Sequence, residues 1–494
     1  MWLSQLLERN RQCRPGRTAL VDEERSVTWA EFHDRTLELA RGLAELGIER
    51  GDRVAVLSKD RIEVLESYFA LARLGALFVP LNHSLAEPEV AGIIERVGAV
   101  AVIGESELLD RHPELPASVR IRLALDKPAF EALGTLAAER DLPEVADTDP
   151  IAVLHTSATT GQAKGVTVDS GSFRAIALGW LVMARPTDDI VMVNCCPLYH
   201  GSMVVSLTYL AAGATVALMP GFTPQRALTA VERHRATHMW LVPQMLRFML
   251  QAKASHRTDL SCLREILYGA APMPLDVYAD AVERLGCGFR QVYGMTEVGG
   301  PFVTLGPDEH PAPGDVTARI PCGRVVPGMS ARAVDGGGRE LPPGEIGEIV
   351  VRGPGVMRGY WNDPQATREI TLDGWIRTGD LGFMDDEGRI SLVDRTKDVI
   401  IRAGQNVYPS EIERALLTHP AVRDAAVVGM PDEDYGEVPL AYVVPEPGAD
   451  PGAAALLGHV KGLLAPYKWP RRVEFIEQVP RNPAGKIVKK LLRA

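Results

Sequence analysis

The chain has 494 residues, of which 46% are hydrophobic and 24% are charged, and its formal net charge at pH 7 is −11. This length suits about three domains, or one large α/β body with a smaller domain attached, and the composition is that of a folded globular protein. The acidic balance argues against nucleic-acid binding, because a surface that follows a phosphate backbone carries a basic excess.

Cysteine usage and the N-terminus favour a cytoplasmic location. The six cysteines have neither C-x-x-C nor zinc-ligand spacing, and no apolar signal segment opens the chain. Residues 195–225 lack Asp, Glu, Lys and Arg and are long enough to cross a bilayer. The break at Gly213 and the flanking prolines favour a buried helix followed by a buried strand, so we expect no membrane span.

The predicted elements indicate an α/β fold. Apolar runs at 53–57, 99–103, 151–155 and 190–194 alternate with helical patterns such as 29–47, which is typical of a mixed or parallel sheet covered by helices. From about residue 320, short strands separated by Gly and Pro predict a small β-rich subdomain, and residues 373–398 predict β-hairpins.

The last hundred residues predict a separate, mobile α+β domain. We expect a strand at 399–403, a loop at 404–409, a helix from Ser410, strands at 424–430 and 439–445, and a helix at 453–464. Ser410 and Glu413 have the spacing of a capping box. The predicted boundaries are a large domain over 1–394, a hinge at 395–397 and a small domain over 398–494.

Three local motifs have the side chains that a nucleotide site needs. After the strand 151–155, TSATTGQAKG (156–165) offers hydroxyls, a flexible glycine and a lysine for a phosphate, although an ordinary polar surface loop explains it equally well. YGMTE (293–297) offers an aromatic face, a hydroxyl and a carboxylate suited to Mg²⁺, or simply a turn. Asp380 in RTGDLG would bind ribose hydroxyls or serve only as a turn residue.

The order of these and further motifs resembles that of the adenylate-forming superfamily. The additional motifs are PLYH (197–200), YGAAPM (268–273), YWNDPQAT (360–367), DRTKDVIIRAGQNVYPSEIE (394–413) and NPAGKI (482–487). This superfamily includes acyl- and aryl-CoA synthetases, adenylation domains and luciferases. The resemblance implies ATP- and Mg²⁺-dependent conversion of a carboxylic acid to an acyl-adenylate, followed by transfer to a thiol of CoA or of a carrier-protein phosphopantetheine.

The resemblance also implies roles for individual residues around the nucleotide. Thr296 would contact the α-phosphate, Glu297 would bind Mg²⁺, and Lys486 would reach the reacting carboxylate and phosphate. Lys397 would be the hinge. The phosphate-loop residues are Thr156, Ser157, Thr159, Thr160, Gly161 and Lys164; the adenine and ribose residues are Gly269, Ala270, Ala271, Tyr293, Gly294, Asp380 and Arg395; and the thiol-tunnel residues are Arg402, Ala403 and Gly404, within a loop that runs to Asn406.

The same resemblance implies an acyl pocket, which would be formed by Trp180, His200, Gly201, Ser202, Trp240, Gly269, Gly294, Val298 and Gly300, with His200 also a catalytic candidate. No acidic residue lies between 190 and 231, so an α-ammonium would have no partner there and a simple amino acid is disfavoured. Tryptophans with glycines suit an aryl or medium-chain acid, but core packing explains the tryptophans as well.

Three departures from the family pattern stand out. Ala158 replaces a common glycine, Gln162-Ala163 replaces a residue followed by proline, and the thiol-tunnel loop reads Arg402-Ala403-Gly404 where two glycines are frequent. CoA is the favoured acceptor because no carrier segment follows residue 494. The alternatives are loading of a separate carrier protein, activation of a nonstandard acid such as nitrite, or a nucleotide sensor without catalysis.

Overall fold

The computed structural model describes residues 1–136, 141–156, 163–199, 201–313, 315, 320–481 and 487–493. The chain divides into two compact units: Met1–Ser330 with Arg352–Ile376, and Ala331–Val351 with Arg377–Ala494. The boundary that we expect at residues 394–398, and the mobility of the small domain, remain predictions.

The largest sheet of the first unit has the strand order β15-β14-β13-β12-β11-β9-β10-β1-β2. It is parallel from β1 through β10, β9, β11 and β12 to β13, whereas β2, β14 and β15 join antiparallel. Its strands are β1 Thr18–Val21, β2 Ser26–Thr28, β9 Val191–Asn194, β10 Thr215–Leu218, β11 His238–Leu241, β12 Glu265–Gly269, β13 Gly288–Met295, β14 Gly300–Leu305 and β15 Arg324–Val325.

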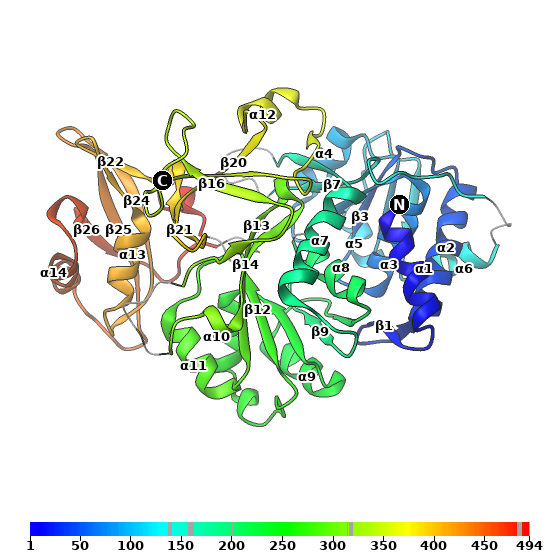
Figure 1. The fold of residues 1–494 in the computed structure, drawn as a ribbon, viewed down its shortest axis with the longest axis horizontal. Helices are drawn as coiled ribbons and strands as arrows, with labels where there is room; N and C mark the ends of the chain where they lie inside the picture. Colours follow the sequence, from blue (N-terminus) through cyan, green and yellow to red (C-terminus); the bar gives the residue numbers. More distant parts are fainter. Residues whose placement is uncertain are drawn as a thin grey trace. The chain divides into compact units, whose positions relative to one another are not determined.

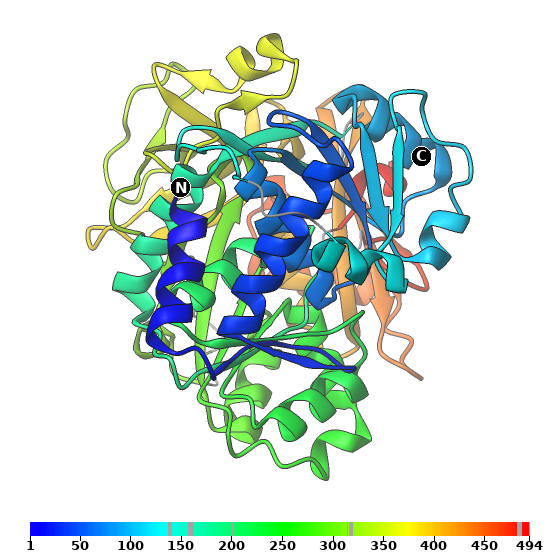
Figure 2. The same cartoon turned by 90° about the vertical axis from the view of Figure 1, so that its right-hand side faces the viewer.

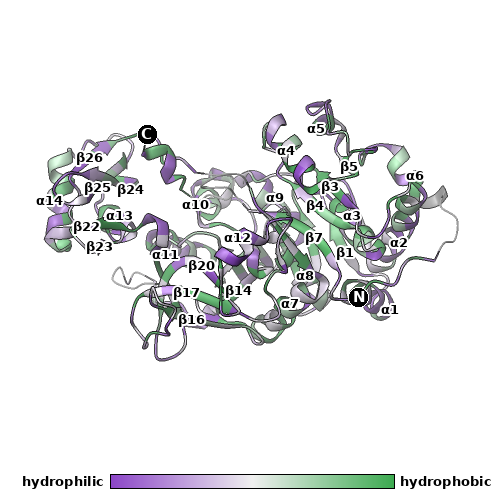
Figure 3. Ribbon diagram, turned by 90° about the horizontal axis from the view of Figure 1, so that it is seen from above, coloured by the Kyte–Doolittle hydropathy of each residue, from purple (hydrophilic) through white to green (hydrophobic). Residues whose placement is uncertain are grey.

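A second sheet of this unit has the order β18-β8-β7-β4-β3-β5-β6. Every residue of its inner strands β4 and β5 is buried, and Figure 3 shows β3, β4 and β7 as strongly hydrophobic. Its strands are β3 Arg53–Leu57, β4 Leu77–Leu81, β5 Ala101–Gly104, β6 Ile121–Ala124, β7 Pro150–His155, β8 Gly165–Asp169 and β18 Gly359–Tyr360.

Helices cover both sheets of the first unit (Figure 1). Figure 2 shows α1 and α2, coloured dark blue, running side by side. The helices are α1 Trp2–Cys13, α2 Trp29–Glu45, α3 Ile62–Leu74, α4 Glu87–Val97, α5 Ser106–Asp110, α6 Pro128–Leu136, α7 Ser170–Ala184, α8 Ser202–Ala212, α9 Pro224–His234, α10 Pro243–Gln251, α11 Leu275–Leu285 and α12 Pro364–Glu369, with 3₁₀ turns η1 Lys253–His256, η2 Thr296–Val298 and η3 Pro307–Glu309.

The charge-free segment folds as the buried alternative predicts. Helix α8 is followed by Gly213 at φ +84°, a conformation that glycine adopts without strain, and then by strand β10. Among the described residues, no helix has both the length and the apolar character that a bilayer crossing requires.

The β-rich region has the order β16-β17-β20-β19, with β21 paired to β20. Its strands are β16 Ser330–Val334, β17 Gly347–Arg352, β19 Thr371–Leu372, β20 Trp375–Met384 and β21 Ile390–Arg395. Strands β20 and β21 form the predicted hairpin. The mixed sheets, this β-rich region and the small α+β region that follows confirm the predicted fold class.

The C-terminal part of the second unit packs α13 Pro409–Leu417 and α14 Ala453–Leu463 on a sheet of order β23-β22-β25-β24, with β26 paired to β25. The strands are β22 Ile400–Arg402, β23 Gln405–Val407, β24 Val422–Asp432, β25 Gly436–Pro445 and β26 Arg472–Phe475, with 3₁₀ turns η4 Thr396–Asp398, η5 Pro466–Lys468 and η6 Lys489–Leu492. Strand β23 occupies part of the segment predicted as a loop, and β26 was not predicted.

The predicted capping box of Ser410 and Glu413 is wrong. Helix α13 begins at Pro409, one residue earlier, because a proline at the first helical position needs no N–H partner. The Ser410 hydroxyl donates instead to the Val393 carbonyl. The Glu413 carboxylate is buried and forms an ion pair with Lys489 at 2.9 Å. Tertiary contacts therefore outweigh the local capping pattern.

Candidate functional site

The predicted phosphate loop is closed by a hairpin. Strands β7 and β8 pair antiparallel. The Thr156 N–H donates to the Lys164 carbonyl at 3.1 Å, and the Lys164 N–H donates to the Thr156 hydroxyl at 3.4 Å. These contacts fix both ends of the segment. Its central residues Ser157, Ala158, Thr159, Thr160, Gly161 and Gln162 lie outside the described residues.

The predicted adenine residues meet at one edge of the large sheet. Gly269 ends β12 and is paired in register with Val292 of β13, directly before Tyr293 and Gly294. A Cβ atom on Gly269 would lie 2.4 Å from the Val292 carbonyl oxygen, so only glycine fits there. Ala270 follows at φ +66°, and Ala271 comes next. Because parallel strands end at the same edge, these residues form one candidate slot.

Thr296 and Glu297 lie in the 3₁₀ turn η2, directly after β13. The Glu297 carboxylate accepts a hydrogen bond from the Tyr360 hydroxyl at 2.8 Å, and its main-chain carbonyl accepts the Met357 N–H at 2.9 Å. Glutamate oxygen is the kind of ligand that Mg²⁺ prefers. The described residues contain no cluster of three metal-ligating side chains. Glu297 would hold a magnesium ion through its carboxylate, and the ion would supply positive charge beside the phosphates of ATP.

The predicted ribose pair comes together in the second unit. Asp380 on β20 stands opposite Arg395 on β21, and the Arg395 Nε lies 3.1 Å from Asp380 Oδ1. The Asp380 side chain is 11% exposed and that of Arg395 is 41% exposed. Lys397 follows in η4, where partial loss of hydration, and then the nearby charge of Arg395, lower the pKa of its ammonium group.

The predicted thiol-tunnel loop is a two-residue hairpin turn. Arg402 of β22 pairs with Gln405 of β23, and the turn residues Ala403 and Gly404 have φ angles of +48° and +79°. Two residues with positive φ are typical of a type I′ turn. The Arg402 guanidinium donates to the carbonyls of Pro466, Tyr467 and Trp469. Arg402 thus anchors a neighbouring loop of its own unit.

Lys486 lies outside the described residues, as do 482–485. Residues on both sides of this segment form contacts within the second unit. Arg481 and Ile487 form a β-bridge, Arg481 donates to both carboxylate oxygens of Asp424, and Lys489 forms the buried ion pair with Glu413. The second unit therefore fixes where the segment that carries Lys486 starts and ends.

Several predicted acyl-pocket residues lie together in the first unit. The Trp240 indole N–H donates to the Ser202 hydroxyl at 3.2 Å, and the Trp240 ring would be 3.2 Å from a Cβ atom on Gly269. The Trp180 indole N–H donates to the Pro301 carbonyl. The remaining members are Gly201 before α8, the buried Val298, Gly294 and Gly300, and His200, which lies outside the described residues.

Two contacts near these motifs were not anticipated from the sequence. Asp60, which follows β3, accepts the N–H of Leu198 at 2.9 Å. Leu198 lies two residues before His200 in the sequence. Burial raises the pKa of Asp60 to about 7. Nothing in its local sequence indicates this contact. Tyr360 bonds to Glu297, and its ring lies 4.9 Å from the Lys164 ammonium. Its motif YWNDPQAT is one of those that carry the family resemblance, but nothing in the motif indicates a contact with Glu297.

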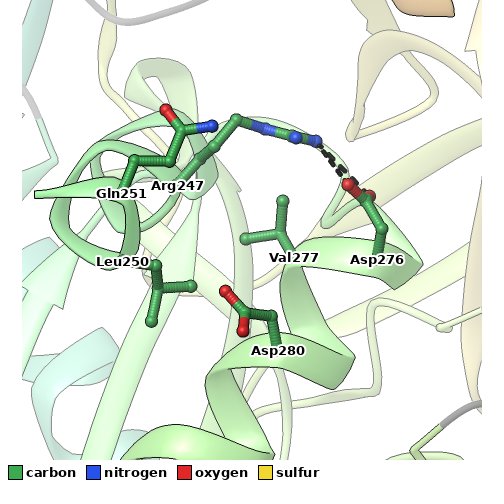
Figure 4. A pocket seen from close by; sticks show the side chains of 6 residues that line it. All are labelled: Arg247, Leu250, Gln251, Asp276, Val277 and Asp280. Atoms are coloured by element: carbon green, nitrogen blue, oxygen red, sulfur yellow. Dashed lines mark hydrogen bonds and ion pairs between the residues drawn. The ribbon is translucent and has the colours of Figure 1, made fainter. Parts of the chain in front are cut away.

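A separate cavity of about 80 Å³ lies between α10 and α11 (Figure 4). It is lined by Arg247, Leu250, Gln251, Asp276, Val277 and Asp280, and Arg247 forms an ion pair with Asp276. None of these residues belongs to the motifs above, so the cavity is not part of the candidate site.

Family models match most of the chain. The model for AMP-binding enzymes matches residues 7–361, and the model for the C-terminal domain of AMP-binding enzymes matches residues 411–486. The chain belongs to the AMP-binding enzyme family. It is thus an AMP-forming ligase of the adenylate-forming superfamily, as its motifs predict.

Relatives match over nearly the whole length. A fatty acid–[acyl-carrier-protein] ligase, ScoC, of Streptomyces coeruleorubidus is 36% identical over 98% of this chain and 94% of its own length. A feruloyl-CoA synthase of an Amycolatopsis species is 37% identical over 97% and 96%. The structure of O-succinylbenzoate coenzyme A synthetase from Bacillus subtilis, in complex with ATP and magnesium ion, has a TM-score of 0.87 at 30% identity and covers 99% and 98%.

Proposed function

We propose that this protein uses Mg·ATP to convert an aryl or medium-chain carboxylic acid to an acyl-adenylate with release of pyrophosphate. It then transfers the acyl group to the thiol of CoA with release of AMP. The observation that carries the proposal is the convergence of Gly269, Tyr293 and Glu297 at one edge of the large sheet. This arrangement supports the proposal, because the predicted adenine residues and the predicted magnesium ligand are close together in the first unit.

In the first half-reaction, each predicted site residue has a separate role. Thr296 and Lys486 would donate to oxygens of the α-phosphate and of the attacking carboxylate, where negative charge accumulates. Glu297 would hold the metal, and Asp380 with Arg395 would orient the ribose. Rotation of the small domain about Lys397 would then withdraw Lys486 and bring the turn at Ala403 to the thiol path.

The choice of acid follows from the pocket residues. No carboxylate is present between residues 190 and 231 to pair with an α-ammonium. The Trp240 ring lies next to Gly269, where a Cβ atom would be 3.2 Å from it, and we assign this aromatic ring to the acyl pocket. The feruloyl-CoA synthase among the relatives supports an aryl acid.

A carrier-protein thiol is the second candidate for the acceptor, because the relative ScoC is a fatty acid–[acyl-carrier-protein] ligase. The two acceptors are separated by measuring thioester formation with CoA and with a holo carrier protein. A hydroxamate-trapping screen of aryl and fatty acids would first identify the acid. No thioester with CoA at saturating acid and ATP would reject CoA as the acceptor. No acid-dependent pyrophosphate release across the screen would reject the ligase proposal.

A further inference from the structure

The tyrosine of the short strand β18 contacts two residues that the proposed function assigns to Mg·ATP. The Tyr360 hydroxyl donates to Glu297 Oε1 at 2.8 Å. On its other side, the Tyr360 ring lies 4.9 Å from the Lys164 ammonium, within the range of a cation–π contact. Tyr360 therefore contacts both the lysine of the phosphate loop and the predicted metal ligand.

Strand pairing places the tyrosine there. Tyr360 is in register with Val166 on β8, the strand that leaves the phosphate loop. The next residue, Trp361, donates its N–H to the Gly165 carbonyl at 2.7 Å. Because Lys164 directly precedes Gly165, the pairing holds the ring of Tyr360 next to the lysine side chain.

The rest of the YWNDPQAT motif fixes the tyrosine backbone. The Thr367 hydroxyl accepts the Tyr360 N–H at 2.9 Å and donates to the Asp363 carbonyl at 2.9 Å. The Asp363 carboxylate in turn caps α12 by accepting the Ala366 N–H. Thr367 of helix α12 thus restrains the backbone of Tyr360.

The same segment holds Glu297 at two points. Its carbonyl accepts the Met357 N–H, and its carboxylate accepts the Tyr360 hydroxyl. In the second of these bonds the Tyr360 hydroxyl is the donor and Glu297 Oε1 is the acceptor. One carboxylate oxygen is oriented by this bond. The other oxygen keeps its capacity to bind a cation.

We propose that Tyr360 is a positioning residue for Mg·ATP, which orients the Glu297 carboxylate through its hydroxyl and holds the Lys164 ammonium through its ring. Magnesium demands near-ideal octahedral geometry, so a carboxylate with a fixed direction binds it better than a rotating one. The inference rests on the proposed function, because that function assigns Glu297 to the metal and Lys164 to the phosphates.

Two variants separate the two contacts. Tyr360→Phe keeps the ring beside Lys164 and removes the hydroxyl bond to Glu297. We expect the Mg²⁺ concentration for half-maximal pyrophosphate release to rise about tenfold, with the KM for ATP at saturating Mg²⁺ changed less than about twofold. Tyr360→Leu removes both contacts and should raise the KM for ATP as well. Tyr442→Phe, which removes a hydroxyl in the second unit, is the matched control.

Binding measurements make the test independent of turnover. Calorimetric titration of ATP at graded Mg²⁺ concentrations should show the same tenfold shift for Tyr360→Phe. In a Glu297→Gln background, Tyr360→Phe should cause no further shift, since the hydroxyl acts through that carboxylate. An unchanged Mg²⁺ dependence of ATP binding in Tyr360→Phe, or a further shift in the Gln background, would overturn the proposal. Absence of ligase activity in the wild type would overturn the proposed function instead.

Discussion

The two units assemble their predicted nucleotide residues in different ways. In the first unit, Lys164, Glu297 and Tyr360 come from three distant segments and meet through strand pairing and loop contacts. In the second unit, Asp380 and Arg395 stand opposite each other in a single β-hairpin.

The difference predicts how substitutions should behave. In a group built from three segments, each residue is positioned by its contacts with the others. A substitution at one residue therefore displaces the others, and the free-energy effects of two substitutions are not additive. A pair set by the register of one hairpin is local, so its loss should leave the rest of its unit in place.

Lys486 sharpens this comparison most, because it belongs to the second unit by sequence, whereas the proposed function assigns Thr296 and Glu297 of the first unit to the same reaction. We expect Lys486→Ala to lower acyl-adenylate formation by about 10²- to 10³-fold, the usual loss for one transition-state donor. Thioester formation from synthetic acyl-adenylate should stay unchanged. The two half-reactions are measured separately, with the exposed neighbour variant Lys490→Ala as control. Equal losses in both half-reactions would contradict the assigned role.

Asp380→Ala tests the hairpin pair. Loss of a charged hydrogen-bond acceptor should raise the KM for ATP about tenfold to a hundredfold, with a smaller change in kcat. Steady-state kinetics at varied ATP measures this split. Asp385→Ala breaks the Asp385–Arg389 ion pair at the far end of the same hairpin and is the control. A comparable rise of KM in the control would mean that the hairpin as a whole is disturbed.

The sequence predicts the local pair more fully than the group built from distant segments. Asp380 in the motif RTGDLG lies in a predicted hairpin, and its partner Arg395 lies on the next strand. The hairpin pattern in the sequence therefore predicts that the two residues are close together. The predicted end of the helix at Gly213 is equally local, and the αL conformation of Gly213 confirms it. The contact of Tyr360 with Glu297 depends on the pairing of β18 with β8, which no nearby sequence pattern encodes.

Local patterns also fail where tertiary contacts compete with them. Thr28 and Glu31 form a true capping box at the start of α2, whereas Ser410 and Glu413 have the same spacing and do not. The difference is that Glu413 is buried and paired with Lys489, whose approach depends on the fold of the C-terminal tail. A spacing rule cannot include a partner that comes from so far along the chain.

Asp60 extends the comparison to buried carboxyl groups. In the second unit Glu413 forms an ion pair with Lys489, whereas in the first unit Asp60 accepts the Leu198 N–H. Burial raises the pKa of Asp60 to about 7 from its ordinary 3.8, so the folded protein binds a proton that the unfolded chain releases between these values. Stability due to this group is present below about pH 4 and is lost as the pH rises towards 7.

Asp60→Asn removes that titration and keeps an acceptor for the Leu198 N–H. Relative to the wild type, its free energy of unfolding should therefore rise by about 1 kcal/mol per pH unit between pH 4 and 7, and then level off. Urea titrations across this range measure the difference. Asp110→Asn, at a side chain that is 82% exposed, should show no such slope. A flat difference for Asp60→Asn would mean that the carboxyl ionises normally in the fold.

The smallest effect is expected at Ala403, where a departure from the family pattern meets a turn that needs positive φ. An L residue at φ +48° carries about 1–2 kcal/mol of strain, and glycine removes it while making the unfolded chain more flexible by about 0.4–1 kcal/mol. Ala403→Gly should thus raise the free energy of unfolding of the second unit by about 0.5–1 kcal/mol. Ala421→Gly, outside the left-handed turn, should instead lower it. If Ala403→Gly also speeds thioester formation, the methyl group narrows the thiol path, whereas a change in stability alone would assign Ala403 only to the turn.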